Sequence, residues 1–366
     1  MRLVNKVACS LAAAIPVAVL AGCSGGSESA TNAAYGLPPE VSSIVIDAVP
    51  TADAAGLYIA YDDGLFTKRG LTVKIDTING GEFGMTDLQD NKVQLVEGNY
   101  VSFILAQLAG KFGFPPGAPV KPINLRMIAN GSQMQPGNQA LYVLPNSPYK
   151  TVADLARKHA TIGINSPNNI AQVLLGALFA ADGLKLSAIH QVVQPVFPEM
   201  PAYLAEHKID AAWLPEPFGT EAEQDYGAVQ LADFDQGSLQ NFPIGAIVGN
   251  TQWVRTHPNT VAAFLRAFQA GQQIADTDRA SVEQALVTHT GVSKVVAATM
   301  TLDTYPLVMD VPVMQRVSNA MFEFGLTPGL KQPYNIANMV QPEPGEITNT
   351  SISGPLGQIK HLPISN

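Results

Sequence analysis

Short apolar strands alternate with amphipathic helices over about 200 residues of this chain, and this alternation restricts the fold more than any other feature. Expected strands include 43–49, 71–78 and 160–164, and expected helices include 54–62 and 169–181. Regular alternation of this kind places helices over the faces of largely parallel sheets. The sequence therefore predicts an α/β fold with mostly parallel sheets, followed by a run of C-terminal helices.

The length of the chain favours two lobes. The sequence has 366 residues, whereas single hydrophobic cores stop growing at roughly 250–300 residues. We expect lobe 1 to comprise residues 43–144 and 243–330, with the C-terminal helices partly on lobe 2, which comprises residues 145–242. Two hinge crossovers would join the lobes, and residues 331–366 would form a C-terminal tail.

The N-terminus has the features of an export signal. Arg2 and Lys6 flank the start of an apolar run over residues 7–20, and small residues then lead to Cys23. A basic start, a short apolar segment and small residues before a cleavage site are typical of secretory signals. A cysteine at this point is typical of a lipobox, so we expect residues 1–22 to be a lipoprotein signal peptide and Cys23 to carry the lipid.

The alternatives for this segment are a plain secretion signal and a membrane-spanning helix. The apolar run is shorter than the roughly 20 residues that a bilayer core requires, which disfavours a spanning helix. Residues 24–34 are rich in small and polar side chains, which is typical of a flexible linker. We therefore expect residues 23–42 to tether an extracytoplasmic protein to the cell membrane.

Composition argues against several classes of function. The chain is 46% hydrophobic and 14% charged with a net charge of −9, so it is globular and acidic. It has no Lys/Arg cluster, which makes nucleic acid a poor candidate partner. Cys9 would leave with the signal, so the folded part has no thiol. The six histidines lack metal-ligand spacing, and no nucleophile elbow or phosphate-binding loop is present. We expect no catalytic residues, no metal and no cofactor.

Candidate ligand-binding residues follow from the fold class. In open α/β sheets, ligands bind beyond the carboxyl ends of the strands. The turns expected at these ends, with one tyrosine of the helix over 54–62, hold polar, glycine and aromatic residues that could form such a site. These candidates are Asp53, Tyr58, Gly81, Asn99, Tyr100, Asn130, Asn165, Ser166, Asn168, Asn169, Trp213 and Glu216.

The sharpest of these sites is the segment Ser166-Pro167-Asn168-Asn169. Proline suits the first position of a helix and serine suits the N-cap. The free N–H groups of Asn168 and Asn169 would then favour an anionic group such as a sulfonate or a carboxylate. The alternative is that Ser166 caps its own helix and contacts no ligand.

The other candidates keep two interpretations each. Asp53 is either an ordinary helix cap or an acceptor for an amino or amidine group. Glu216 either holds a crossover in place or contacts the ligand. Trp213 and Tyr100 either stack on a planar ligand or belong to the core. Few cations lie near the expected cleft, which disfavours small hydrated anions such as nitrate and favours a ligand with a neutral or partly apolar body.

Four segments resemble the substrate-binding proteins of ABC importers in the nitrate/taurine/alkanesulfonate group, which includes the binders of thiamine-pyrimidine precursors. They occur in the order and spacing of that family. They are GLYIAYDDGLFTKRGLTVKI (Gly56–Ile75), TVADLARKHATIGINSPNN (Thr151–Asn169), HKIDAAWLPEPF (His207–Phe218) and FPIGAIVGNTQWVRTHPNTVAAFLRAF (Phe242–Phe268).

The resemblance implies the type II periplasmic-binding fold, with two lobes, two crossovers and a cleft between them. It also implies a monomeric, non-enzymatic lipoprotein that captures a small organic solute (sulfonate-, taurine- or pyrimidine-like) and delivers it to an ABC permease. Two alternatives remain. One is a ligand-sensing module that reports to a membrane signalling protein, and the other is a pyrimidine-precursor synthase of the same fold.

Overall fold

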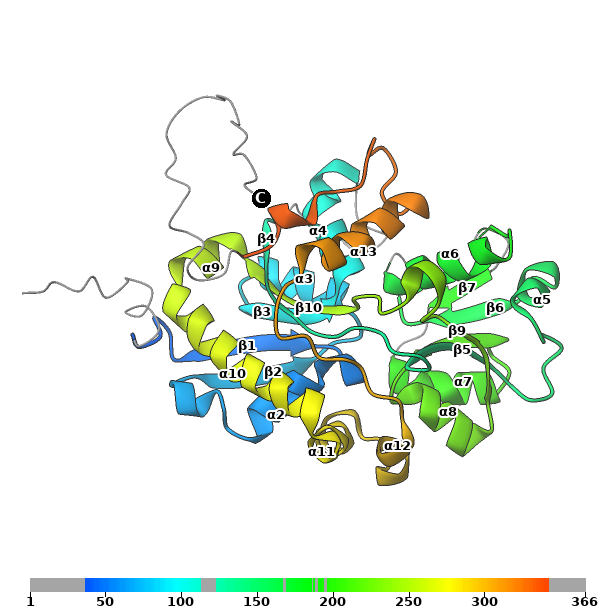
Figure 1. Ribbon diagram of the computed structural model, residues 1–366, viewed down its shortest axis with the longest axis horizontal. Helices are drawn as coiled ribbons and strands as arrows, with labels where there is room; N and C mark the ends of the chain where they lie inside the picture. The colour runs from blue at the N-terminus through cyan, green and yellow to red at the C-terminus, as the bar shows by residue number, and fades with distance from the viewer. Residues whose placement is uncertain are drawn as a thin grey trace, which may run out of the picture.

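The computed structural model describes residues 37–112, 123–166, 169–185, 187, 190–193 and 196–341. Two five-stranded sheets lie in separate halves of the molecule (Figure 1). The first sheet has the order β2 (Thr72–Thr77), β1 (Ser43–Ala48), β3 (Leu95–Asn99), β10 (Gly245–Asn250) and β4 (Leu125–Asn130). The second has the order β7 (His190–Val193), β6 (Thr161–Ile164), β8 (Ala211–Pro215), β5 (Gln139–Val143) and β9 (Val229–Asp233).

Both sheets are mixed, in the same way. In the first sheet β1 pairs in parallel with β2 and β3, whereas β10 pairs antiparallel with β3 and β4. In the second sheet β6 pairs in parallel with β7 and β8, whereas β5 pairs antiparallel with β8 and β9. The α/β class with mostly parallel sheets is confirmed, because in each sheet four strands run in one direction and a single strand, β10 or β5, runs against them.

Helices accompany both sheets (Figure 1). In the half that holds the first sheet lie α2 (Ala55–Asp62), α3 (Gly81–Gln89), α4 (Tyr100–Phe112), α9 (Thr251–Thr256), α10 (Pro258–Thr277) and α11 (Arg279–Thr290). In the half that holds the second lie α5 (Val152–Arg157), α6 (Ile170–Ala181), α7 (Met200–Ala205) and α8 (Phe218–Tyr226). The short α12 (Lys294–Thr299) contacts α8, and α13 (Val311–Glu323) contacts both α4 and α6. The C-terminal helices therefore touch both halves.

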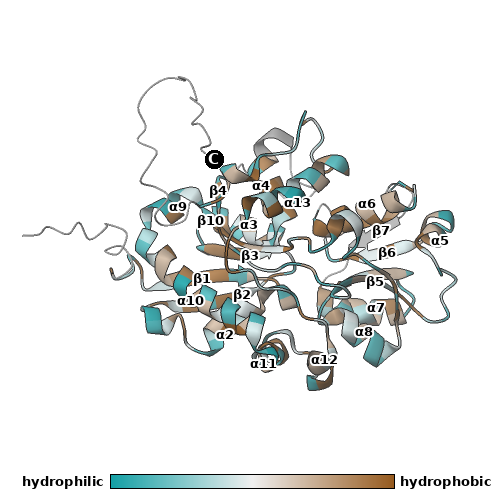
Figure 2. Ribbon diagram, viewed as in Figure 1, coloured by the Kyte–Doolittle hydropathy of each residue, from teal (hydrophilic) through white to brown (hydrophobic). Residues whose placement is uncertain are grey.

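Two hydrophobic clusters stabilise the fold. One fills the face of the first sheet that α2 and α10 cover, where the ring of Phe264 stacks on those of Phe66 and Phe268 at centroid distances of 5.1 and 6.0 Å. The other lies under α3 and α4 and continues through the second sheet. In Figure 2 the central strands of the first sheet are brown and teal is concentrated on outward-facing helix turns. The continuity of the second cluster shows that the two halves are packed against each other.

Helices α2 and α10 cross at glycines. A Cβ atom built on Gly271 would lie 2.2 Å from the backbone oxygen of Gly56 and 2.8 Å from the Cβ of Ala60. Atoms cannot approach this closely, so a side chain at Gly271 would force the two helices apart.

We expect Gly271→Val to lower the free energy of unfolding by about 1–3 kcal/mol, the usual cost of overpacking a tight core. The measurement is urea unfolding followed by circular dichroism. Gln273→Ala, on the exposed side of the same helix, serves as the control and should leave the transition unchanged. An equal stability of Gly271→Val and the wild type would contradict the close crossing.

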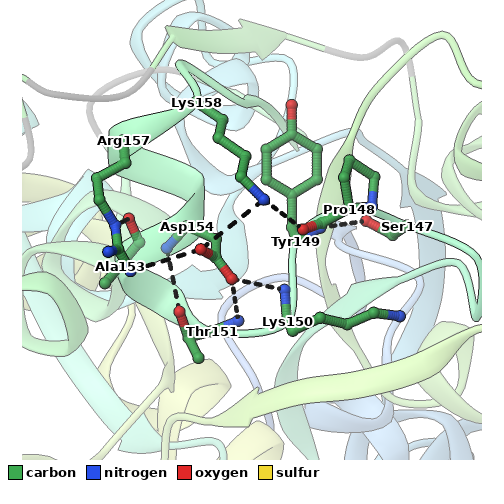
Figure 3. Close-up of polar contacts among 9 residues, drawn as sticks. All are labelled: Ser147, Pro148, Tyr149, Lys150, Thr151, Ala153, Asp154, Arg157 and Lys158. Carbon is green, nitrogen blue, oxygen red and sulfur yellow. Dashed lines mark hydrogen bonds and ion pairs between the residues drawn. The ribbon is translucent and has the colours of Figure 1, made fainter.

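Helix α5 begins with a capping box (Figure 3). The Oγ1 atom of Thr151 accepts a hydrogen bond from the backbone N–H of Asp154 (3.1 Å), and the Asp154 carboxylate accepts from the N–H of Thr151 (3.1 Å) and of Lys150 (3.0 Å). These hydrogen bonds lower the pKa of Asp154, and the bond from the backbone N–H of Lys150 has the largest effect. The Nζ atom of Lys158 lies 3.9 Å from the same carboxylate and donates to the carbonyl of Pro148. The polar residues that open the segment 151–169 therefore serve the helix itself.

Three segments pass between the halves. Residues 131–138 lead from β4 to β5, and residues 234–244 lead back from β9 to β10. A third segment, between α12 and α13, runs beside them, and Gln133 forms β-bridges to both Pro243 and Thr304 (Figure 1). The sequence predicted only the first two. It also placed residues up to 144 in lobe 1, whereas β5 belongs to the second sheet, because this apolar strand pairs with β8 and β9.

The described part of the C-terminal tail docks on the first sheet. Val340 forms a bridge to Met127 of β4, and Nη1 of Arg126 donates to the carbonyl oxygens of Val340 (3.1 Å) and Asn338 (3.3 Å). Residues 331–341 are therefore held at the edge of β4. The expected signal peptide, Cys23, residues 23–36 of the tether and residues 342–366 of the tail lie outside the described residues.

Candidate functional site

A small cavity of about 30 Å³ lies between the two sheets, at the ends of strands from both. The first half contributes β3, β10, the turn after β1 and the N-cap of α3. The second half contributes β5, β8, the turn after β6, the start of α6 and the 3-10 turn η4 (Phe197–Glu199). The lining residues are Val49, Thr51, Asp53, Gly80, Glu97, Gly98, Asn99, Gln139, Asn165, Ile170, Phe197, Trp213, Pro215, Ile244 and Gly245. Ligand pockets usually measure roughly 300 Å³ or more, so the halves stand close together around this site.

Asp53 is one of two buried carboxyl groups in the first half of the lining. It lies in the 3-10 turn η1 (Ala52–Ala54) after β1. Its Oδ1 atom accepts a hydrogen bond from the hydroxyl of Ser132 (2.6 Å), and its Oδ2 atom accepts one from the hydroxyl of Thr51 (2.7 Å). Burial raises the pKa of Asp53 even though these two hydrogen bonds act to lower it.

Glu97 is the other carboxyl group, and only 2% of its surface is exposed. Its Oε2 atom accepts a hydrogen bond from the backbone N–H of Val49 (3.0 Å), the one donor to this group within the described part of the chain. Its Oε1 atom lies toward the bare backbone of Gly245, where a Cβ atom would stand 3.5 Å away. Burial, together with the charge of Asp53, raises the pKa of Glu97 to about 8. Glu97 is therefore protonated at neutral pH when the site holds no cation.

A third carboxyl group, Asp303, is buried next to these two in the segment between α12 and α13. The amide nitrogen of Asn138 donates a hydrogen bond to it. Burial, and then the charges of Asp53, Glu216 and Glu97, raise the pKa of Asp303 well above its usual range. The junction of the three crossing segments therefore concentrates acidic groups behind the cavity.

The wall on the side of the second sheet is apolar and aromatic. Trp213 on β8 donates its Nε1–H to Oε1 of Gln139 (3.1 Å), and the ring of Phe197 meets the Trp213 ring edge to face at a centroid distance of 5.4 Å. Ile170, the first residue of α6, completes this wall. The site thus places carboxyl groups opposite aromatic rings.

Polar contacts join the halves beside the cavity. The Nδ2 atom of Asn165 donates to the backbone oxygen of Asn79 (2.9 Å). The side chain of Ser166 forms a hydrogen bond with the carboxyl group of Glu82, a half-buried residue near the start of α3. The backbone N–H of Ala52 donates to the backbone carbonyl oxygen of Glu216 (2.9 Å). Separation of the halves would break each of these bonds.

Four of the predicted site residues line the cavity, namely Asp53, Asn99, Asn165 and Trp213. The structure places the other described candidates outside the lining. Tyr58 donates to the carbonyl of Val49 and stacks on His289, and Tyr100 donates to Asn130, whose amide in turn donates to Val308. Gly81 is the first residue of α3, and its backbone packs against Gly98. Asn168 lies outside the described residues.

Glu216 has a structural role in this arrangement. Its carboxylate accepts from the backbone N–H of Thr220 (3.1 Å) and from the Thr220 hydroxyl (2.7 Å), at the start of α8. It also accepts from the N–H of Thr301 (3.4 Å) on the third crossing segment. Burial raises the pKa of Glu216 to about 7. These contacts agree with the structural interpretation of Glu216. Glu216 is also not among the residues that line the cavity.

The prediction that Ser166 caps the following helix is wrong. Asn169 is the N-cap of α6, and its Oδ1 atom accepts from the N–H of Ala171 (3.0 Å) while its Nδ2 atom donates to Asn165. Asparagine caps helices as well as serine does, and here it lies directly before the apolar helical run. The side chain of Asn169 therefore forms its hydrogen bonds within the second half, whereas the side chain of Ser166 contacts Glu82.

Sequence reasoning missed Glu97, Gln139 and Phe197. Glu97 had a usable signal, since it is the only charged residue in the apolar run Leu95–Asn99 and a Gly-Asn pair follows it. Gln139 and Phe197 had none, because Gln139 is the first residue of β5 and Phe197 is the first of η4, and the local sequence does not show that these starts face the cavity.

Among the described residues, no three His, Cys, Asp or Glu side chains are grouped so that they could hold a metal ion. No helix among the same residues is long and apolar enough to span a bilayer.

Comparisons with known proteins agree with this arrangement. The NMT1-like family matches residues 37–288. A nitrate/nitrite binding protein of Nostoc sp. (strain PCC 7120) is 25% identical over 292 residues, which is 72% of this chain and 64% of the relative. The chain thus spans less than two thirds of that relative's length.

Solved structures show the same fold. An alkanesulfonate-binding protein of Xanthomonas axonopodis pv. citri has a TM-score of 0.67 at 18% identity, with 82% of this chain and 99% of that one covered. A periplasmic nitrate-binding protein of Synechocystis PCC 6803 has a TM-score of 0.66 at 16% identity, with 81% and 84% covered. The resemblance predicted from the four segments is thereby confirmed. The chain belongs to the NMT1-like family and has the type II periplasmic-binding fold of the nitrate- and sulfonate-binding proteins.

Proposed function

We propose that this protein is an extracytoplasmic solute-binding lipoprotein, anchored through Cys23, which captures a small organic molecule between its halves and delivers it to an ABC permease. The observation that carries the proposal is the cavity itself, because residues from both sheets line it. A solute in such a cavity contacts both halves at once only when they are close together. Binding therefore favours the closed state, which a permease can distinguish from the open one.

The three crossing segments would act as the hinge. The bonds from Asn165 to Asn79 and between Ser166 and Glu82 join side chains or loops of the two halves near the cavity. These contacts would break when the halves separate and admit a solute larger than the present cavity. We assign the ligand contacts to Asp53, Glu97, Asn99, Asn165 and Trp213, all of which line the cavity.

The chain offers a direct test of solute binding, because it has only two tryptophans. Trp213 lines the cavity, whereas Trp253 stacks on His257 in the first half, outside the lining. In a Trp253→Phe variant of the full chain, we expect solute to change the fluorescence of Trp213 in a saturable way. The matched Trp213→Phe variant should show no such change. The solute panel comprises small amines, sulfonates, nitrate and aminopyrimidines, together with any compound that native mass spectrometry finds on protein purified without refolding.

A solute that binds the folded state should also raise the melting temperature, since about 100-fold excess over Kd adds about 2.7 kcal/mol to stability. Co-purification with a permease would separate import from sensing, because a sensor would instead co-purify with a signalling protein. If no compound of the panel and no carried-over molecule binds, the proposed function is wrong.

A further inference from the structure

The hydrogen-bonding groups of the cavity show which charge its ligand carries. The donors of the lining are largely used within the protein: the hydroxyl of Thr51 donates to Asp53, the Trp213 N–H to Gln139, and the Asn165 amide to Asn79. Lysine and arginine are absent from the described lining residues. Pro167 and Asn168, which follow Ser166 and are not described, carry no charge either. The side chains of Asn99 and Gln139 accept hydrogen bonds through their oxygens, from Ser102 and Trp213, so their amide nitrogens remain as neutral donors. The charged side chains of the described lining are thus all acidic.

The two acidic side chains of the lining are placed to receive a positively charged group. Oε1 of Glu97 receives no hydrogen bond from any described residue and lies toward Gly245, which also lines the cavity. Asp53 is close enough for its charge to act on Glu97. A nitrate or sulfonate here would have no lysine or arginine to pair with and would have to keep the neighbouring carboxyl groups protonated, and burial of an anion without a cation is unfavourable.

The opposite wall suits the rest of such a ligand. The rings of Trp213 and Phe197 and the side chain of Ile170 offer apolar surface. The faces of aromatic rings also attract cations, most strongly when the pair is shielded from water. A flat or short apolar body would therefore lie against these rings while its charged end reaches the carboxyl groups.

We propose that the cavity takes a small organic cation, a protonated amine or amidine on a flat or short apolar body, with its charged end between Asp53 and Glu97 and its body against Trp213 and Phe197. This inference rests on the proposed function and specifies its ligand. A cationic ligand would distinguish this chain from the relatives that are named for binding nitrate or alkanesulfonate.

A cation at this place would replace the proton on Glu97. The titratable groups that face Glu97 are Asp53, Tyr58 and Asp303, and none of them supplies a positive charge. Burial raises the pKa of Glu97 to about 8, so the empty site holds a proton at neutral pH, and the bound cation would release it. Binding of a cation should therefore tighten as the pH rises toward 8, by up to about tenfold per pH unit for one released proton.

The test compares ligands that share a body and differ in charge. Ethylammonium and ethanesulfonate form one such pair, and 4-aminopyridine and nitrate add a flat cation and a small anion. Titration calorimetry and the fluorescence of the Trp253→Phe variant would measure their affinities for the full chain at pH 6, 7 and 8. We expect the cations to bind at least tenfold more tightly than the anions, with an affinity that increases with pH.

Glu97→Gln should lower the affinity for the cations at least tenfold at pH 8 and weaken its dependence on pH, to which Asp53 still contributes because burial raises its pKa as well. Because glutamine keeps the shape of a protonated glutamate, this variant should fold, which its circular dichroism would verify. Glu206→Gln, at an exposed carboxylate paired with Lys208, is the matched control and should bind like the wild type.

Two outcomes would overturn the inference. Tighter binding of ethanesulfonate or nitrate than of either cation would show that the ligand is an anion, while solute binding itself would stand. Cation binding that Glu97→Gln leaves unchanged would place the cation elsewhere. If neither class binds and no carried-over solute is found, this inference and the proposed function fail together.

Discussion

The free energy of unfolding of the ligand-free protein is expected to fall from pH 5 to pH 8, and Glu97→Gln is expected to reduce that fall by about 3 kcal/mol. Burial raises the pKa of Glu97 to about 8, whereas in the unfolded chain it lies near 4.3. Between these two values the folded protein binds a proton that the unfolded chain does not. Each pH unit in this window then lowers stability by about 1.4 kcal/mol.

Other buried carboxyl groups act in the same direction. Burial raises the pKa of Glu216 to about 7, of Glu221 to about 7 and of Asp47 to about 6. Glu97→Gln should therefore flatten the profile without making it level. The variant should be more stable than the wild type at pH 8, because glutamine needs no proton.

The measurement is urea unfolding at pH 5, 6, 7 and 8, followed by tryptophan fluorescence. Glu206→Gln should reproduce the profile of the wild type, since that carboxylate is exposed. A level profile in the wild type, or an unchanged slope in Glu97→Gln, would contradict the assignment of a buried, protonated Glu97.

Phe264→Ala should lower the free energy of unfolding by about 3–5 kcal/mol, the usual cost of deleting a fully buried phenylalanine ring. Phe264 lies between the rings of Phe66 and Phe268 in the cluster under α10 and has no exposed surface. This cluster and the cavity have no residue in common. The variant should therefore bind solute normally at temperatures where it is folded.

Chemical denaturation monitored by circular dichroism would measure this loss. Gln269→Ala, one turn further along α10 and exposed, provides the comparison and should cost less than about 0.5 kcal/mol. A loss below about 1 kcal/mol for Phe264→Ala would mean that α10 does not depend on this ring for its packing.

Local sequence patterns predicted most elements of the fold to within a few residues. The strand β1 and the helix α6 are examples, because their apolar residues recur with the period of the element that they form. Helix α3 was missed, since glycines at 80, 81 and 84 indicate a turn. In the structure Gly81 and Gly84 instead allow the helix to approach Gly98 and Val96 closely, so packing outweighs the low helix propensity of glycine.

The candidate site was predicted only in part, and the reason is geometric. Asp53, Asn99, Asn165 and Trp213 were found because residues at strand ends meet at one edge of a sheet. Tyr100 and Asn130 occupy equivalent positions, yet they bond to each other and to the third crossing segment. Which strand-end residues face the cavity depends on how the two halves meet, and no local pattern contains that information.

The sequence by itself determined the α/β class, the family and the strand ends that could form a site, because apolar periodicity and turn residues are local properties of the chain. Only the tertiary structure decided that Glu97 faces the cavity and that a third segment joins the halves. Those features arise from contacts between residues far apart in the sequence, such as Glu97 with Val49 and Gln133 with Thr304. The charge of the cavity, and with it the proposed cationic ligand, depends on these long-range contacts.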